Sequence, residues 1–378
     1  MTPYLPFARP EIDEQTIAAV GDVLRSGWIT SGPQVLRFEQ ALSARFGGRP
    51  VRAFTSATAA LEVALDLAGV GPGDEVVVPA MTFVASANVV LRAGARAVLV
   101  DVDLDSRNTD AARIEAALTP RTRAIMPVHF AGLPVDLAPV YALAKRRGLR
   151  VIEDAAHAMG AAYGERAIGA QGDLVAFSFH PNKNITSIEG GALSFADPAE
   201  VERAERLRFH GIRKLAGAEI EVEEPGGKFN LPDVCATIGL AQLAHLERFN
   251  ARRRELARRY FEHLRGLEHV RLPAADRPGH SWHLFAPLVD FQKAGTTRGA
   301  FIEAMHARGI GVGVHYPALH LFAAYRRLGY RPGDFPNAEM IGARTVTLPL
   351  FTRMSDADLH KVCSAMTDIL REESNGRA

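Results

Sequence analysis

The sequence predicts an α/β protein in which a large domain, built on a mostly parallel seven-stranded sheet flanked by helices, precedes a smaller C-terminal α/β domain. Between residues 51 and 196, short runs rich in β-branched residues alternate with amphipathic helical stretches, which is typical of a parallel sheet covered by helices. After residue 198 the pattern becomes mainly helical, and a second, smaller α/β pattern begins near residue 265. A chain of 378 residues has room for two cores, so we place the domains at 1–250 and 251–378.

Seven runs are expected to form the strands of the large sheet, and they lie at 51–54, 75–79, 97–102, 124–128, 150–153, 174–179 and 192–195. The last two runs are joined by a loop that has no room for a crossover helix, so they cannot form a parallel pair. A helix is expected upstream of the first strand, because Pro33 suits a first helical turn and Gly47 suits a helix end. Other helices are expected at 59–68, 111–118, 137–147, 232–246 and 252–264, and the small domain is built around 282–289, 297–308 and 311–316.

Charge and composition exclude several classes of protein. The net charge is +1 with acids and bases interleaved, which argues against a nucleic-acid-binding stripe or a patch for anionic membranes. No apolar run is long enough to span a bilayer, and the segment before Glu11 lacks the basic flank and apolar core of a signal peptide. Cys235 and Cys363 have no spacing that suggests a metal site or a disulfide framework. We therefore expect a cytoplasmic protein without membrane insertion, bound metal or a nucleic-acid partner.

Lys183 is the first candidate for a catalytic residue, because it follows a short apolar strand in a chain that uses little lysine. Arginine carries almost all of the positive charge, and of the two side chains only the lysine ammonium can lose its proton and form a Schiff base. His180, three residues earlier, could contact substrate or assist proton transfer, but a structural histidine explains it as well. Lysine occurs at six positions: 145, 183, 214, 228, 293 and 361.

Two further polar segments follow predicted strands, where ligands collect in open α/β sheets. Asp154 comes directly after an apolar strand and is followed by His157, although a helix N-cap at Asp154 explains this acid equally well. The small residues 55–58 join a strand to a helix, so backbone N–H groups, the helix dipole and the hydroxyls of Ser56 and Thr58 could hold a phosphate. Ordinary capping explains this segment as well, and it lacks the glycine spacing of a dinucleotide site or a P-loop.

A loop lysine, a strand-end carboxylate and a candidate phosphate cradle are together the three anchors that pyridoxal 5′-phosphate (PLP) requires. We expect Lys183 to bind the cofactor covalently and Asp154 to keep its pyridine nitrogen protonated, so that the ring can accept electrons. Phe83 is placed to stack on the ring, although a phenylalanine of the hydrophobic core would explain it without the other three anchors.

Segments spread over nearly the whole chain resemble the PLP-dependent nucleotide-sugar aminotransferases of the DegT/DnrJ/EryC1/StrS family. The resemblance implies the fold of a fold-type I aminotransferase, and glutamate as the amino donor. The segments are SGWITSGP (26–33), TSATAALEVAL (55–65), GDEVVVPAMTFVASAN (73–88), VIEDAAHAMGA (151–161), FSFHPNKNITSIEGGA (177–192), KFNLPDVCATIGLAQL (228–243), WHLF (282–285) and GVGVHYPALH (311–320).

The resemblance also implies a role at each matching position around the cofactor ring. Lys183 would be the Schiff-base lysine, and Asp154 would be the partner of the pyridinium nitrogen. His157 would lie near the ring and its 3′-oxygen, and Phe83 would stack on the ring.

The phosphate and the substrate have implied partners as well. Ala57, Thr58 and Ser178 would hold the phosphate, and Asn230 would reach the phosphate of the neighbouring subunit. That last role implies an obligate homodimer with a shared active site. The candidate substrate contacts, each of which packing could also explain, are Trp28, Thr30, His180, His315 and Tyr316.

Within the family, the opening LPF-RP (5–10), SGWITSGP, EDAAHA, KFNLPD and WHLF most resemble enzymes that aminate UDP-4-keto-pentose to UDP-4-amino-4-deoxy-L-arabinose for lipopolysaccharide modification. Phe83, which replaces an expected tryptophan, and Pro181-Asn182 depart from that pattern, so 4-keto-6-deoxy and 3-keto nucleotide sugars are alternatives. Lys183 disfavours a sugar dehydratase of the same family, because histidine replaces the lysine there. A non-enzymatic regulator on this scaffold is also disfavoured, because it has no need of all three anchors.

Overall fold

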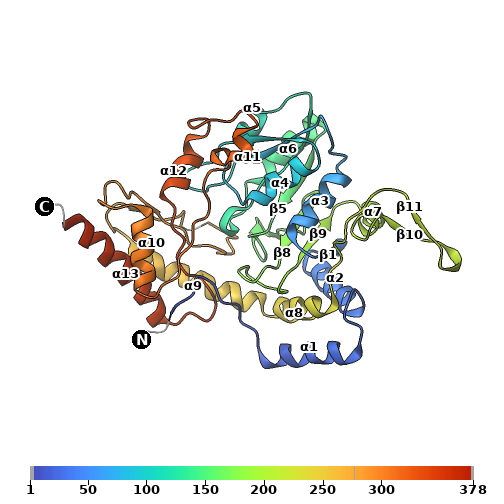
Figure 1. Cartoon of the computed structure of the whole chain (residues 1–378), viewed down its shortest axis with the longest axis horizontal. Helices are drawn as coiled ribbons and strands as arrows, with labels where there is room; N and C mark the ends of the chain where they lie inside the picture. The colour runs from blue at the N-terminus through green and yellow to red at the C-terminus, as the bar shows by residue number, and fades with distance from the viewer. Residues whose placement is uncertain (1–3, 276, 376–378) are drawn as a thin grey trace.

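The computed structural model describes residues 4–275 and 277–375, and its centre is one seven-stranded sheet (Figure 1). The strand order is β1-β9-β8-β5-β4-β2-β3, so strands that are distant in sequence lie side by side. The seven expected strands are confirmed, with small shifts at their ends. They are β1 (Val51–Phe54), β2 (Glu75–Pro79), β3 (Arg96–Val100), β4 (Thr122–Ile125), β5 (Arg150–Asp154), β8 (Leu174–Ser178) and β9 (Gly191–Phe195).

β9 runs against the other strands of this sheet. It pairs antiparallel with β8, where Ser178 lies opposite Gly191, and with β1, where Phe54 lies opposite the same glycine. The short loop between β8 and β9 requires this arrangement, as the sequence predicts. All other neighbours in the sheet are parallel. The carboxyl ends of the parallel strands therefore meet the amino end of β9 at one edge.

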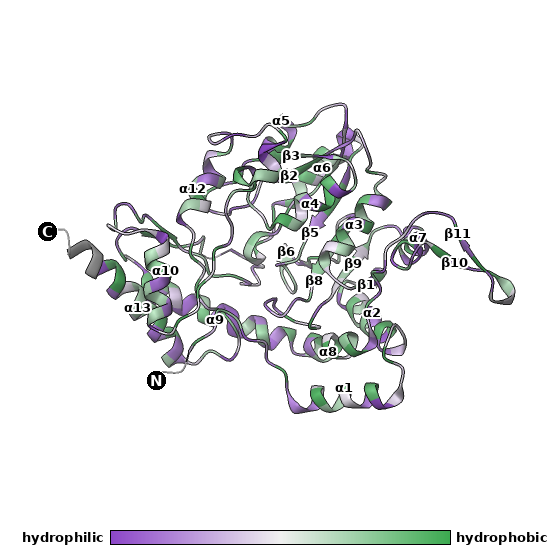
Figure 2. Cartoon of the chain, in the orientation of Figure 1, coloured by the Kyte–Doolittle hydropathy of each residue, from purple (hydrophilic) through white to green (hydrophobic). Residues whose placement is uncertain are grey.

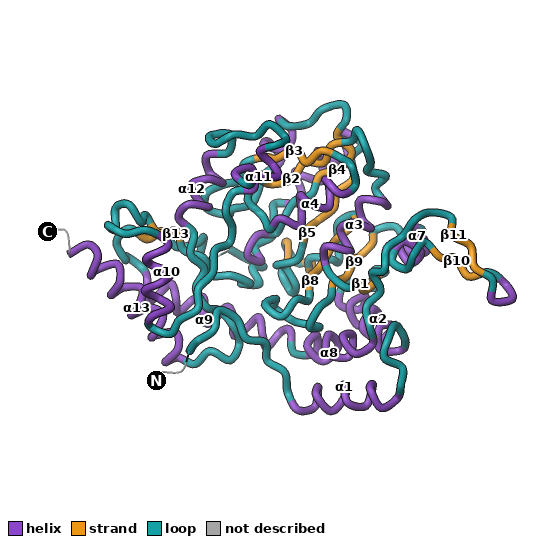
Figure 3. The backbone as a smooth tube through the Cα atoms, in the orientation of Figure 1, coloured by secondary structure: helices purple, strands orange, loops and turns teal. Residues whose placement is uncertain are grey.

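Helices cover both faces of the sheet, so that strands such as β2 and β8, which are mainly apolar, are buried along their whole length. Figure 3 shows the strands of this sheet among the helices at the centre of the molecule. None of the helices in the two described ranges is long and apolar enough to cross a bilayer. One face is covered by α3 (Ala57–Leu67), α4 (Val84–Arg92) and α7 (Glu200–Leu207), and the other by α2 (Pro33–Arg45), α5 (Ala111–Ala116), α6 (Leu137–Arg147) and α8 (Asp233–Ala244).

The C-terminal part packs around a third core, in which Tyr260, Phe285 and Phe301 are fully buried. The segment 311–316 was expected to be a regular element of this part, but it forms no helix or strand and makes one isolated bridge, from Gly313 to Thr347. The division at residue 250 falls inside α9 and stays a prediction. The elements here are α9 (Leu246–Leu264), β12 (Val270–Arg271), β13 (Leu288–Val289), α10 (Arg298–Ala307) and α13 (Asp356–Asn375). The helices α11 (Ala323–Arg326) and α12 (Pro336–Arg344) pack instead on the core that includes α3 and α4.

The N-terminal helix α1 (Glu14–Ser26) is absent from the sequence-based expectations. Apolar and polar stretches alternate along it (Figure 2), and Ile17, Val20 and Leu24 recur at helical spacing. The sequence therefore carries a periodic signal for this helix, although Ile17 and Leu24 are exposed in the single chain. Its ends are marked locally as well, by Asp13 as N-cap and by Gly27 in a left-handed conformation.

A hairpin interrupts the region after residue 198 that was expected to be mainly helical. Strands β10 (Ile212–Lys214) and β11 (Ile220–Val222) pair antiparallel and project from the molecule at the right of Figure 1. Gly217, at φ +74°, allows the left-handed turn between them. A smaller hairpin is formed by β6 (Ala162–Tyr163) and β7 (Arg166–Ala167).

Candidate active site

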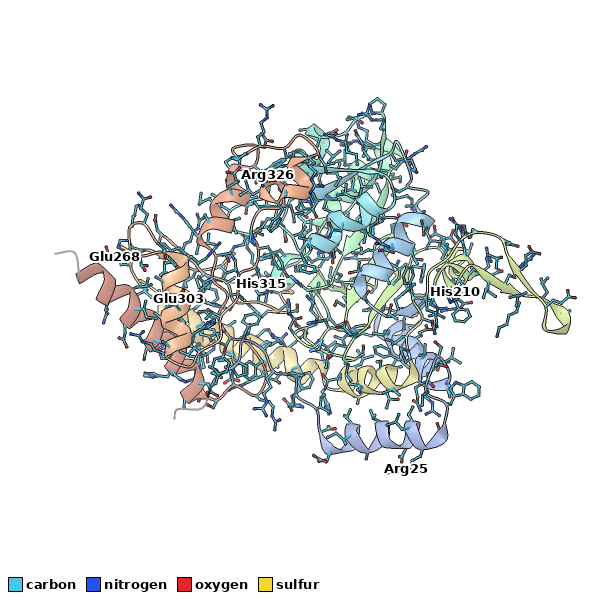
Figure 4. All side chains as sticks on the ribbon, viewed as in Figure 1. Arg25, His210, Glu268, Glu303, His315 and Arg326 are labelled. Atoms are coloured by element: carbon cyan, nitrogen blue, oxygen red, sulfur yellow. The ribbon has the colours of Figure 1, made fainter. Side chains whose placement is uncertain are left out.

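A cavity of about 330 Å³ opens at the edge of the sheet where the parallel strands end. Residues at or after the ends of β1, β2, β4, β5 and β8 line it, together with two residues of the irregular segment that precedes α11. His315, from that segment, is labelled near the centre of Figure 4, between the sheet and the C-terminal part. The predicted site residues brought together here are Ala57, Thr58, Phe83, Asp154, His157, Ser178, His180, Lys183, His315 and Tyr316.

Lys183 reaches the cavity from the loop between β8 and β9. Backbone hydrogen bonds fix this loop, from Lys183 N to His180 O (2.9 Å) and from Ser187 N to Phe179 O (2.9 Å). Burial lowers the pKa of Lys183 from 10.5 to about 8, and the negative charge of Asp154 offsets part of that shift. The amine is therefore neutral in a substantial fraction of molecules near neutral pH, which a nucleophile requires.

Asp154 ends β5 and is only 5% exposed. Its Oδ2 accepts a hydrogen bond from Ser86 Oγ (2.7 Å), and its Oδ1 accepts one from Ala156 N (3.1 Å). The interpretation of Asp154 as a helix N-cap is wrong, because turns and not a helix follow it. A carboxylate has about four acceptor positions, so Asp154 can still hold a cationic N–H group in the cavity.

The turn between β1 and α3 forms the wall next to Lys183. Ser56 caps α3 by accepting a hydrogen bond from Ala59 N (3.1 Å), so the capping interpretation is confirmed. The first bond along the helix runs from Ala60 N to Ser56 O (3.1 Å), which leaves earlier N–H groups available to an anion. Gly191 allows this turn to approach β9, because a Cβ there would lie 2.4 Å from Ala57 N. Backbone N–H groups at the start of α3 therefore form the candidate phosphate cradle.

Aromatic rings and two histidines form the rest of the wall. Phe83 is 52% exposed, so the interpretation as a core phenylalanine is wrong, and its ring centroid lies 5.7 Å from that of Tyr316. Tyr316 Oη lies 3.2 Å from His157 Nε2. Burial lowers the pKa of His157 well below 6.5 and the pKa of His315 to about 4, and the positive charge of Lys183 adds to both shifts. Both histidines are therefore neutral near pH 7.

Ser86 and Glu189 are among the residues at the site that were not singled out from the sequence. Ser86 is buried in α4 and bonds Asp154 across 68 positions of the chain, so no local motif marks it. Glu189 lines the cavity mouth, with Oε1 4.0 Å from His180 Nε2. His180 is exposed, and its Nδ1 lies 2.8 Å from Asn182 Oδ1, so its ring is held within its own loop.

Trp28, Thr30 and Asn230 do not line the cavity of this chain. They gather at the start of α2, where Asn230 Nδ2 donates to Ser31 Oγ (2.7 Å) and Thr30 O accepts from Asp233 N (3.0 Å). Trp28 is 60% exposed. Within one chain these residues therefore form a separate surface group.

The groups around the cavity suit PLP. The buried carboxylate of Asp154 suits a cationic ring nitrogen, the N-terminus of α3 suits a phosphate, and the exposed face of Phe83 suits a flat ring. Lys183 supplies the amine. In residues 4–275 and 277–375, no group of three or more His, Cys, Asp or Glu side chains is arranged to hold a metal ion.

Comparison with known proteins gives consistent results. A model of the DegT/DnrJ/EryC1/StrS aminotransferase family matches residues 10–367. Spr1654 from Streptococcus pneumoniae, assigned as a sugar aminotransferase and solved in its PMP form, superposes with a TM-score of 0.93 at 32% identity, covering 99% of both chains. The aminotransferase TlmJ from Streptoalloteichus hindustanus gives 0.90 at 34% identity, covering 97% of this chain and 99% of its own. Helicobacter pylori PseC, an aminotransferase involved in the biosynthesis of pseudoaminic acid, gives 0.91 at 28% identity, covering 98% of this chain and 100% of its own.

Proposed function

We propose that this chain, which belongs to the DegT/DnrJ/EryC1/StrS aminotransferase family, transfers the amino group of L-glutamate to a nucleotide-linked keto-sugar. It is a PLP-dependent sugar aminotransferase with the fold-type I architecture. The observation that carries the proposal is the shared cavity of Lys183 and Asp154. One supplies an amine with a lowered pKa, and the other supplies a buried negative charge.

The substrate we propose is UDP-4-keto-pentose, which would place the enzyme in lipopolysaccharide modification. The proposal is supported by segments, among them 26–33, 228–233 and 282–285, that resemble the enzymes that aminate UDP-4-keto-pentose. Another 4-keto-6-deoxy or 3-keto nucleotide sugar is the second candidate, because Phe83 provides a smaller ring than the tryptophan expected for the pentose enzymes.

Five residues of the cavity have a proposed part in the reaction. PLP, when bound, supplies an electron sink for the carbon that loses or gains a proton. Lys183 would bind the cofactor, and after its release Nζ would take the proton from the donor carbon and return it; a pKa of about 8 makes both protonation states available. Asp154 would keep the ring nitrogen protonated. Ala57, Thr58 and Ser178 would hold the phosphate.

A second copy of the chain would complete the site. Asn230 and the exposed side chains of Trp28 and Thr30 lie outside the cavity of their own chain, on a surface that a partner subunit could cover. We propose a homodimer in which Asn230 reaches the phosphate of the partner's cofactor. We place this enzyme in the cytoplasm, where its two unpaired cysteines, Cys235 and Cys363, would stay reduced.

A panel of nucleotide keto-sugars tests the substrate. The protein is loaded with PLP and converted with L-glutamate, so that its visible absorption fades, and each sugar is then added. UDP-4-keto-pentose is expected to restore the visible band at least about tenfold faster than 4-keto-6-deoxy or 3-keto sugars, because one misplaced group in a fitted pocket costs about 1–3 kcal/mol.

The control for this panel is pyruvate, a keto compound without sugar or nucleotide. If glutamate bleaches the band but a 6-deoxy sugar restores it fastest, the pentose assignment is wrong and the amino transfer stands. If glutamate leaves the band unchanged, glutamate is not the donor.

The lowered pKa of Lys183 predicts how the cofactor-free protein takes up PLP. Only the neutral amine attacks the aldehyde, so the association rate should rise roughly tenfold per pH unit below about pH 7 and level off above about pH 8. Stopped-flow absorbance at a series of pH values measures this rate. A rate that keeps rising to about pH 10, as expected of an exposed lysine, would contradict the shift.

A further inference from the structure

The hydrogen bonds of His157 fix which of its ring nitrogens carries the proton. Nδ1 accepts a hydrogen bond from the backbone N–H of Ala131 (3.3 Å), and an amide cannot exchange this role, because it has only a proton to give. A neutral His157 therefore carries its own proton on Nε2. Burial keeps the ring neutral, since it lowers the pKa of His157 well below 6.5.

The backbone around Ala131 is shaped to make this contact. Ala131 lies in the short helix η1 (Phe130–Gly132) at φ +56°, a left-handed conformation that is uncommon for a residue with a side chain. A Cβ at Gly132 would lie 2.9 Å from His157 O and 3.2 Å from His283 N, so this turn is wedged tightly between two segments. The N–H group is therefore held in place and does not follow the ring.

The orientation of Tyr316 follows from this tautomer. His157 Nε2 carries a proton and lies 3.2 Å from Tyr316 Oη, so His157 is the donor and the tyrosine oxygen is the acceptor. The hydroxyl hydrogen of Tyr316 must then point elsewhere. No second hydrogen bond of this hydroxyl is present in the described parts of the chain, and Tyr316 lines the same cavity as Lys183.

The order of the strands indicates which atom of PLP the hydroxyl hydrogen of Tyr316 would face. The strands β8, β5 and β4 are neighbours in the sheet, in that order. The phosphate cradle follows β1 and β8, and Asp154 ends β5. The helix η1, which contacts His157, follows β4. In PLP, the phosphate arm and the phenolic oxygen lie on opposite sides of the line from the ring nitrogen to the aldehyde carbon. If Asp154 holds that nitrogen and Lys183 binds the aldehyde carbon, the phenolic oxygen would lie on the β4 side of the ring.

We infer that Tyr316 donates the hydrogen bond to the phenolic oxygen of PLP and that His157 is a positioning residue that acts through Tyr316. The inference rests on the proposed binding of the cofactor by Lys183. It differs from the role that family resemblance gives His157, which would place that ring against the oxygen directly. The aromatic contacts of Tyr316 with Phe83 (5.7 Å) and Phe130 (6.2 Å) hold the phenol ring in position.

The consequence is a lower pKa of the cofactor bound to Lys183. A donor at the phenolic oxygen favours the form with more negative charge on that oxygen, which is the deprotonated form. The titratable groups that face Tyr316 are Asp154, His157, His315 and Lys183. The two histidines stay neutral over the range of interest and Asp154 is unchanged by the substitution below, so the donor itself is what changes.

Absorbance titration of the PLP-loaded protein with pH tests the inference. In Tyr316→Phe the ring and its packing remain, so we expect the visible band to persist and its pKa to rise by about one to two units, the size of one hydrogen bond to a charged group. His157→Ala should shift it in the same direction by less. Tyr260→Phe is the matched control, because it removes a buried hydroxyl that donates to Pro349 O (2.7 Å) in the C-terminal core, and it should leave the pKa unchanged.

Two results would overturn the inference. A band in Tyr316→Phe that titrates as in the unsubstituted protein excludes the donor role. A larger shift in His157→Ala than in Tyr316→Phe assigns the oxygen to His157. Both outcomes are distinct from failure of the proposed function, in which the unsubstituted protein would show no visible band with PLP. If Tyr316→Phe does not fold, the His157→Ala titration still decides, since a shift of several units there would identify His157 as the donor.

Discussion

Lys183→Arg is expected to abolish transamination. The guanidinium keeps the positive charge but cannot lose its proton near neutral pH, so it can neither bond the cofactor nor act as general base. Loss of the general base alone should lower turnover by roughly 10²–10⁴-fold. The visible absorption of the PLP-loaded protein should disappear as well. Steady-state assay with glutamate and the best keto-sugar, together with the absorption spectrum, measures both effects.

Lys145→Arg is the control for this substitution, because Lys145 is exposed in the last turn of α6. It makes the same chemical change far from the cavity and should leave spectrum and turnover unaffected. Retention of the visible band in Lys183→Arg would show that another amine binds PLP, and the assignment of Lys183 would then fail.

Much of the main sheet could be predicted, because each strand carries its own signal. The runs at 75–79 and 174–178 are apolar except for Glu75 at one end and Ser178 at the other, which is typical of strands buried on both faces. Loop length alone predicted that β9 opposes β8. The helix α1 is absent from the expectations although Ile17, Val20 and Leu24 recur at helical spacing, and only the folded chain shows that Ile17 and Leu24 are exposed.

The anchors of the candidate site could be found in sequence, whereas the contacts that position them could not. Lys183 and Asp154 each follow an apolar run, which makes them visible locally. Ser86 bonds Asp154 across 68 positions, and Ala131 bonds His157 across 26, so only the folded chain brings them together. The left-handed conformation of Ala131 is equally hidden, because alanine gives no sequence signal for it.

Adjacent acids in β5 have different functions because successive side chains of a strand point to opposite faces. Asp154 faces the cavity, whereas Glu153 is fully buried on the other side. There it accepts a hydrogen bond from Tyr141 Oη (2.5 Å), and its Oε2 lies 2.9 Å from His129 Nε2. His129 Nδ1 accepts a hydrogen bond from Val135 N (3.0 Å), so the neutral ring carries its hydrogen on Nε2 and donates it in a hydrogen bond to Glu153 Oε2. Glu153 therefore stabilises the fold, and only its neighbour can serve the cofactor.

Asp154→Asn should show that Asp154 serves the cofactor. It should lower turnover and also move the pH profile for PLP association. The amide keeps the shape of the side chain and can still accept from Ser86, but it has no charge to hold a protonated ring nitrogen. Turnover is expected to fall by roughly 10²–10³-fold, the size of losing one charge-stabilising group. Cofactor uptake should respond differently. Asp154 raises the pKa of Lys183, so its neutralisation lowers that pKa below about 8, and the pH profile for PLP association moves to lower pH.

Glu153→Gln is the matched control, since it makes the same change one residue away on the opposite face. It should lower the melting temperature, because the buried bonds to His129 and Tyr141 lose their charged acceptor, and it should leave the turnover of folded protein and the uptake profile unchanged. A slower Asp154→Asn enzyme whose uptake profile stays at about pH 8 would show that Asp154 does not act on Lys183 through its charge. Loss of turnover in both variants would mean that the integrity of β5, and not the charge at the cavity, controls the reaction.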